Sequence, residues 1–190
     1  MTATATAIGP HLFWIISRAA GSAALVLASL SVCVGLTMGA KLVKGRGPDL
    51  RVTHEAMSIA TLAAIAIHGL ALLGDGYLHP TLGAIAVPFL GSYKTLLTST
   101  GIVAFWLMAL LGLSYYVRGR IGIQRWRRLH RFAALAWALG LVHSLGEGTD
   151  SGQAWFFAMT AVVVVPALAL LAWRHLRPSA AAPAPRSAAR

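Results

Sequence analysis

The sequence alternates between long apolar runs and short segments that collect charged residues. Runs without Asp, Glu, Lys or Arg cover residues 19–40, 56–74, 76–93, 95–117, 132–146 and 151–173. Because a membrane-spanning helix needs about 20 mostly apolar residues, the pattern predicts an all-α integral membrane protein. Five of the runs, extended to their polar boundaries, predict a bundle of transmembrane helices at about 12–40, 52–73, 97–117, 126–146 and 154–174.

The run at 76–93 differs from the others because it is rich in residues that break helices. It contains Pro80 and Pro88 together with several glycines. A lipid-exposed helix tolerates such residues poorly, since the freed backbone groups have no partner in the hydrocarbon. We therefore expect an interfacial or re-entrant loop here, with one short helix.

The positions of the basic residues support five spans. All Lys and Arg residues except Arg18 and Lys94 lie in three segments, at 41–51, 118–131 and 174–190. Five spans place these segments on one side of the membrane, whereas a sixth span would divide them. Cytoplasmic loops carry the excess of Lys and Arg. The pattern thus predicts a short outside N-terminus at 1–11, a membrane domain at 12–174 and a cytoplasmic C-terminus, with a disordered Ala/Pro/Ser-rich tail at 178–190.

Composition restricts the class of protein further. The chain is 57% hydrophobic and 11% charged, against about 25% charged residues in soluble domains, which excludes a soluble globule and a disordered chain. The only cysteine, Cys33, excludes a disulfide framework and a Cys-based metal site. The net charge of +11 comes from residues that flank the spans, so topology explains it better than nucleic-acid binding does. The first ten residues hold no Lys or Arg, unlike a cleavable signal peptide.

Two of the predicted helices carry two histidines each. His54 and His68 are 14 residues apart, and His130 and His143 are 13 residues apart. With one helix between them, the two histidine-bearing helices run in the same direction. His54 therefore pairs by depth with His130 near the cytoplasmic side, and His68 pairs with His143 toward the outside. The two depths differ by about 20 Å, which is most of the hydrocarbon core.

The angular positions of these histidines around their helices fit the pairing less well than their depths do. At about 100° per residue, His54 and His68 share one face of their helix, but His130 and His143 differ by about 140° on an ideal helix. A tilt, a π-bulge or a kink near Gly140 would bring the second pair onto one face.

Two imidazoles at one depth suit a haem iron better than zinc. Zinc takes four protein or water ligands, and no Asp, Glu or Cys is expected at the outer depth. Haem iron needs only two axial ligands, and the chain has no Cys-x-x-Cys-His motif, so a bound haem is b-type and non-covalent. The competing interpretations are histidines that only bond to neighbouring helices and a proton relay. A relay normally includes acidic partners, and only Glu55 is near.

These features resemble the ferric reductase-like transmembrane domain, which ferric reductases, NADPH oxidases and the haem subunit of the bacterial periplasmic methionine sulfoxide reductase system share. The resemblance rests on the two histidine spacings and on the segment Arg125-Trp126-Arg127-Arg128-Leu129-His130-Arg131. It covers about residues 12–174 and implies two b haems stacked across the membrane, with transmembrane electron transfer. The family's usual form has one more N-terminal helix, and its larger members add a flavin- and NADPH-binding domain; we expect neither here.

Three arginines are candidate ligands of haem propionates. Arg18 lies in the outer half of the first helix, where a buried guanidinium needs an anionic partner, and some family members place an Arg similarly. Arg128 and Arg131 lie beside the inner histidine pair. Snorkelling for Arg18, and topology determination for the other two, are the alternative explanations. His79, which precedes Pro80, is expected to be an ordinary loop residue.

The sequence thus predicts a multi-pass cytochrome b of the cell membrane, with His54, His68, His130 and His143 as iron ligands and two haems, or only one. The expected donor is a separate flavoprotein reductase or a quinol. The acceptor lies outside, among ferric iron, oxygen, quinone or a secreted protein. The alternatives are a non-redox scaffold or transporter subunit and a haem carrier or sensor. High Ala, Arg and Gly content is typical of a GC-rich bacterium.

Overall fold

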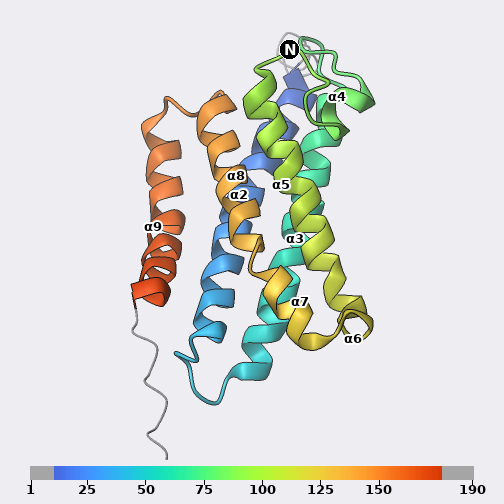
Figure 1. Cartoon of the computed structure of the whole chain (residues 1–190). Coiled ribbons are helices and arrows are strands. Elements are labelled where there is room, and N and C mark those ends of the chain that lie inside the picture. Colours follow the sequence, from blue (N-terminus) through green and yellow to red (C-terminus); the bar gives the residue numbers. More distant parts are fainter. Residues whose placement is uncertain (1–10, 177–190) are drawn as a thin grey trace, which may run out of the picture.

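A computed structural model describes residues 11–176, and in this range the chain is helical without any strand (Figure 1). The long helices are α2 (Leu12–Gly39), α3 (Gly47–Leu72), α5 (Thr95–Leu113), α8 (Ala133–Glu147) and α9 (Ala154–Leu176). The predicted tail at 178–190 and residues 1–10 of the predicted N-terminal segment lie outside the described residues.

Within residues 11–176, four helices are long and apolar enough to cross a membrane: Leu12–Gly39, Gly47–Leu72, Thr95–Ile121 and Ala154–Leu176. Large aliphatic side chains on these helices are exposed, such as Val52 at 68% and Val162 at 73%. Lipid rather than water must cover such side chains, because water would penalise so much exposed apolar surface. The chain is therefore an all-α, multi-pass membrane protein.

The two ends of the bundle differ in structure and in charge. One end holds the start of α2 and the short helix α4 (Leu82–Ala86), and we call it the α4 end. The opposite end holds the α2–α3 loop, the 3-10 turn η2 (Ser114–Val117), α6 (Arg118–Ile121) and α7 (Ile123–His130), and we call it the α6 end (Figure 1). The basic segments at 41–51 and 118–131 both lie at the α6 end, as the charge pattern predicts.

The segment 76–93 forms a loop over the α4 end that contains α4 and no other helix. The carboxylate of Asp75 is buried and accepts backbone hydrogen bonds from Tyr77 and Leu78, which fixes the start of the loop. The indole nitrogen of Trp106 on α5 donates to the backbone carbonyl of Ala86 at 2.8 Å. This arrangement agrees with the predicted loop containing one short helix.

The predicted helix at 126–146 is not continuous, because it is divided at Arg131 and Phe132 into α7 and α8. Across the break the backbone bonds run from residue i to residue i−3, from Phe132 to Leu129 and from Ala134 to Arg131. Such bonds wind the chain more tightly than an α-helix does. The change in direction thus falls one or two residues after His130, and not near Gly140, where α8 stays regular.

Helix α2 lies against α3, α8 and α9, and it packs most extensively against α3. The buried core forms where α2, α8 and α9 meet, and it contains Ala28, Trp137, Val163, Val164 and Ala167. Helix α5 packs against α8. Among the described helices, α3 and α8 are not a closely packed pair, although they and the adjoining α7 carry the four histidines.

Candidate haem-binding site

The four predicted histidines form two facing pairs at different depths. The ring centroids of His54 and His130 are 6.1 Å apart, with an angle of 88° between the ring planes. Those of His68 and His143 are 6.2 Å apart, at 73°. His68 and His143 form the α4-end pair, and His54 and His130 form the α6-end pair. The structure thus places together the same partners that the spacing along the sequence predicts.

Helix α2 fixes the two histidines of α3 through their Nδ1 atoms. Nδ1 of His68 lies 2.8 Å from the carbonyl oxygen of Ser17 and 3.0 Å from its hydroxyl. Nδ1 of His54 lies 2.9 Å from the carbonyl oxygen of Ser31 and 3.1 Å from its hydroxyl. A carbonyl accepts only, so each Nδ1 carries the hydrogen. The Nε2 atom then holds the free lone pair, which is the tautomer that an iron ligand needs.

The remaining two histidines are held differently from each other. Nδ1 of His143 lies 2.9 Å from the carbonyl oxygen of Leu97 on α5. Nδ1 of His130 is buried and has no well-formed hydrogen bond, although the backbone of Leu111 is nearby. The ring of His130 instead stacks on Trp126, with centroids 4.9 Å apart and planes at 24°. Three of the four rings therefore have a hydrogen-bonded orientation, and packing orients the fourth.

Glycines make room for three of the rings. A β-carbon on Gly21 would lie 3.0 Å from Nδ1 of His68, and one on Gly35 would lie 3.1 Å from Cε1 of His54. On α5, a β-carbon on Gly101 would come within 2.7 Å of the ring of His143. These backbones approach the imidazoles so closely that only glycine fits without a shift.

Each pair opens into a cavity. The α4-end cavity has a volume of about 510 Å³, within the usual range of roughly 300–1,000 Å³ for ligand sites. The α6-end cavity is much smaller, about 80 Å³. Ala28, Met108 and Trp137 line both cavities and form the wall between them. The α4 end therefore has the space for a macrocycle, whereas at the α6 end side chains must move or part of the macrocycle must face lipid.

The separation within each pair fits an iron held between two imidazoles. A metal–nitrogen distance of about 2 Å on each side, plus about 1.1 Å from each nitrogen to its ring centre, gives about 6.2 Å between centroids. The measured 6.1 and 6.2 Å agree with this value. Among residues 11–176 no group of three or more His, Cys, Asp or Glu side chains is arranged to hold a metal ion. Each pair thus offers two nitrogen donors, which is the number that a bis-histidine haem iron takes from a protein.

Arg18 has a protein partner that the sequence did not indicate. Its guanidinium forms a two-pronged ion pair with the carboxylate of Asp150, with Nε 2.9 Å from Oδ2, and it lies over the ring of Trp14 at 4.1 Å. Arg18 and Asp150 both line the α4-end cavity. The contact of Arg18 with a haem propionate in this cavity stays a prediction. The anionic partner that the guanidinium needs within the membrane is already supplied by Asp150.

The other predicted polar residues lie away from the cavities. Arg128 and Arg131 are exposed at the α6 end, and neither lines the α6-end cavity. His79 is exposed in the loop before α4. The expectation that no acidic side chain lies at the depth of His143 is wrong, since Oε2 of Glu147 is 3.1 Å from its Nδ1. The i, i+4 spacing of His143 and Glu147 could have indicated this contact, because such residues share a helix face.

Comparison with known proteins agrees with this geometry. No curated protein and no solved structure gives a significant match to the chain. A family model described as "Ferric reductase like transmembrane component" matches residues 20–141. The match includes His54, His68 and His130 and ends two residues before His143. Since it covers more than half of the chain, this protein belongs to the ferric reductase-like transmembrane component family.

Proposed function

We propose that this protein is a di-haem b-type cytochrome that transfers electrons across the cell membrane of a bacterium. His68 and His143 would bind one haem at the α4 end, and His54 and His130 would bind a second haem at the α6 end. When bound, haem iron supplies reversible one-electron chemistry. The observation that carries the proposal is the equal separation of the two histidine pairs, 6.1 and 6.2 Å, at two depths of one bundle.

Backbone carbonyls and side chains of this protein would have defined roles in that function. The carbonyl oxygens of Ser17, Ser31 and Leu97 hold three histidines in the tautomer that leaves the lone pair of Nε2 free to bind iron. A haem held by both histidines of a pair would supply electron transfer rather than a binding position for a reactant, because two imidazoles would occupy the positions that the macrocycle leaves free. The linings of the two cavities, which are mostly apolar but include Arg18, Glu147 and Asp150 at the α4 end, would help to set the reduction potentials.

The charge distribution supports an orientation. Basic residues gather at the α6 end, and the positive-inside rule assigns such an end to the cytoplasm. Electrons would then enter at the α6 end from a flavoprotein reductase or from a quinol in the membrane. They would leave at the α4 end to an acceptor outside, such as ferric iron, oxygen, quinone or a secreted protein. An acidic flavoprotein suits the basic end electrostatically.

The first test is the visible spectrum of the purified protein. A reduced-minus-oxidised spectrum with b-type bands and two haems per chain is the expected result. His68→Ala and His143→Ala should each remove the α4-end haem, and His54→Ala and His130→Ala should each remove the α6-end haem. His79→Ala is the control, because His79 is exposed and should leave the haem content unchanged. A colourless protein, or full haem content in the four ligand variants, would refute the proposal.

The orientation needs a separate experiment. In a Cys33→Ser background, Gly152→Cys places a thiol in the exposed α8–α9 loop, and Lys44→Cys places one in the exposed α2–α3 loop. A membrane-impermeant thiol reagent added to intact cells should label the first variant and spare the second until the cells are opened. The reverse pattern of labelling would invert the proposed direction of electron transfer.

A proton relay is the second candidate function. The contact between His143 and Glu147 favours it, because a relay needs acidic groups beside its histidines. On this alternative the purified protein is colourless, and liposomes containing it conduct protons. The haem assay therefore separates the two functions in one measurement.

A further inference from the structure

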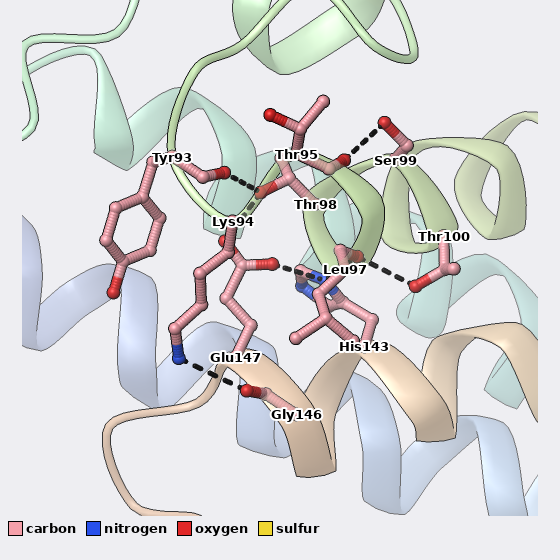
Figure 2. A network of polar contacts seen from close by, with 10 residues as sticks. All are labelled: Tyr93, Lys94, Thr95, Leu97, Thr98, Ser99, Thr100, His143, Gly146 and Glu147. Atoms are coloured by element: carbon pink, nitrogen blue, oxygen red, sulfur yellow. Dashed lines mark hydrogen bonds and ion pairs between the residues drawn. The ribbon is translucent and has the colours of Figure 1, made fainter.

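The carboxylate of Glu147 lies against the imidazole of His143. Glu147 is the last residue of α8, one turn after His143, and its Oε2 atom is 3.1 Å from Nδ1 of that ring. Its other oxygen, Oε1, accepts a hydrogen bond of 2.6 Å from the hydroxyl of Thr98 on α5. Figure 2 shows this network, in which α5 and the end of α8 enclose the ring. The side chain of Glu147 is only 14% exposed, so water screens its charge weakly.

The groups around the carboxylate leave its buried Oε2 atom beside the imidazole without a hydrogen bond of its own. The Nδ1–H group of His143 donates to the carbonyl oxygen of Leu97 at 2.9 Å, and the carboxylate lies beside this bond. Lys94 is the nearby cation in Figure 2, but its ammonium group donates to the carbonyl oxygen of Gly146 at 3.2 Å. The negative charge of Glu147 is therefore directed at the imidazole rather than paired with Lys94.

No corresponding group occurs at the other three histidines. His54 and His68 contact only the neutral carbonyl and hydroxyl of a serine through Nδ1. His130 is stacked on Trp126. Glu55, which follows His54 on α3, accepts a hydrogen bond from the hydroxyl of Tyr116. In the described part of the chain, His143 is the only one of the four with a carboxylate at ion-pair distance.

We infer that Glu147 is a positioning residue that makes the α4-end haem the stronger reductant of the two. A carboxylate beside the distal nitrogen of a coordinating imidazole raises the donor strength of the ligand. A stronger donor with a negative charge nearby stabilises ferric over ferrous iron and lowers the reduction potential. This inference rests on the proposed function, since it requires a haem between His68 and His143. Its consequence is that electrons leaving the α4 end have a greater driving force toward their acceptor.

A redox titration of the purified, haem-loaded protein tests the inference. Glu147→Gln keeps the size of the side chain and removes its charge. We expect it to raise the midpoint potential of the α4-end haem by about 59 mV. For a one-electron couple this shift corresponds to a tenfold change in the ratio of ferric to ferrous iron at a given potential. The other haem should keep its potential. Glu55→Gln is the matched control, because it removes an acid of the same bundle that contacts no histidine.

A spectroscopic readout separates an electronic role from a structural one. In Glu147→Gln, the electron paramagnetic resonance g values of one low-spin ferric haem should shift, while the haem content stays at the wild-type level. If the variant loses haem, Glu147→Asp replaces it, because the shorter side chain draws the carboxylate away from Nδ1 of His143 and should shift the same potential in the same direction. Unchanged potentials in every haem-loaded variant would overturn the inference. A wild-type protein without haem would instead refute the proposed function.

Discussion

Gly21 lies so close to His68 that a β-carbon on Gly21 would be 3.0 Å from Nδ1 of the imidazole. The same relationship recurs one site away, between Gly35 and His54. The two glycines are 14 residues apart, as are the two histidines that they face and the serines, Ser17 and Ser31, that anchor those histidines. Helix α2 therefore repeats one binding unit along its length, and each copy orients one histidine of α3.

Gly21→Ala and Gly35→Ala should each weaken one haem site. The added methyl group requires the anchored ring to move by a few tenths of an ångström, because the contact is shorter than nine in ten real β-carbon contacts. We expect the affinity for haem to fall about tenfold, at the α4 end for Gly21→Ala and at the α6 end for Gly35→Ala. Changes to residues that support a metal ligand commonly have an effect of this size. Titration of the haem-free protein with haem measures this affinity. Gly39→Ala is the control, since its β-carbon would lie an ordinary 3.6 Å from Arg174; an effect equal to that of Gly35→Ala would contradict the steric argument.

Ser17→Ala should have a smaller effect than Gly21→Ala. It removes the hydroxyl that lies 3.0 Å from Nδ1 of His68, but it leaves the backbone carbonyl at 2.8 Å in place. The ring therefore keeps its main acceptor, and haem content should stay close to that of the wild type. The same titration measures this difference. A loss of haem as large as that in Gly21→Ala would mean that the hydroxyl, and not the carbonyl, orients the ring.

The pairing of the histidines was predictable from the sequence, whereas the geometry that allows it was not. Two spacings of nearly equal length on parallel helices suffice to match His54 with His130 and His68 with His143. The required rotation of His130 relative to His143 comes from the break at Arg131 and Phe132, where no proline or glycine marks it. Propensity carries no signal for such a break, because it depends on packing of α7 and α8 against different neighbours.

The polar partners were predictable to different degrees. The repeat of Ser17 and Gly21 at Ser31 and Gly35 matches the histidine spacing and was available in the sequence. Asp150 is 132 residues from Arg18 along the chain, so only the three-dimensional fold brings them together. A buried guanidinium in an apolar helix indicates that an anion is needed, but it does not say whether the protein or a ligand supplies that anion.

Variants of Arg18 and Asp150 can show whether Arg18 pairs only with the carboxylate of the protein or also with a bound haem propionate. If the arginine serves only the ion pair, Arg18→Gln and Asp150→Asn should each lower the free energy of unfolding by on the order of 1 kcal/mol, because Arg18 is partly exposed. Arg18→Gln should cost more, because it leaves the buried carboxylate of Asp150 unpaired, and the double variant should lose less than the sum of the two. We expect a difference in haem binding. Arg18→Gln should weaken the α4-end haem, because it also removes the cation available to a propionate. Equal haem affinity in both single variants would show that Arg18 serves Asp150 alone.

Trp126→Leu should affect the α6-end site and spare the α4-end site. The indole stacks on His130, whose Nδ1 has no well-formed hydrogen bond, and its nitrogen donates to Ser114 at 3.0 Å. Without the indole, stacking of about 0.5–1.5 kcal/mol is lost, so haem affinity at the α6 end should fall by up to about tenfold. Haem titration of Trp126→Leu and of the exposed control Trp155→Leu measures the difference. A loss confined to the α4-end haem would show that the stacking does not hold His130.

Trp137 forms the wall between the two cavities, and its substitution should affect both of them. The indole is 2% exposed and donates to Ser29, which is completely buried, at 3.0 Å. Trp137→Phe keeps most of the ring and loses this bond, at a cost of about 1 kcal/mol. Trp137→Ala removes the wall, and we expect it to destabilise the bundle by about 3–5 kcal/mol.

Thermal unfolding in detergent and haem content measure the two effects. Trp137→Phe should bind both haems, whereas Trp137→Ala should lose occupancy at both sites, since the wall supports each cavity. Trp155→Phe, at an exposed position on α9, is the control for a change from tryptophan to phenylalanine. Loss of only one haem in Trp137→Ala would mean that the two cavities are structurally independent. If Trp137→Ala loses both haems and Trp137→Phe retains both, the volume of the ring, rather than its hydrogen bond, keeps the two sites apart.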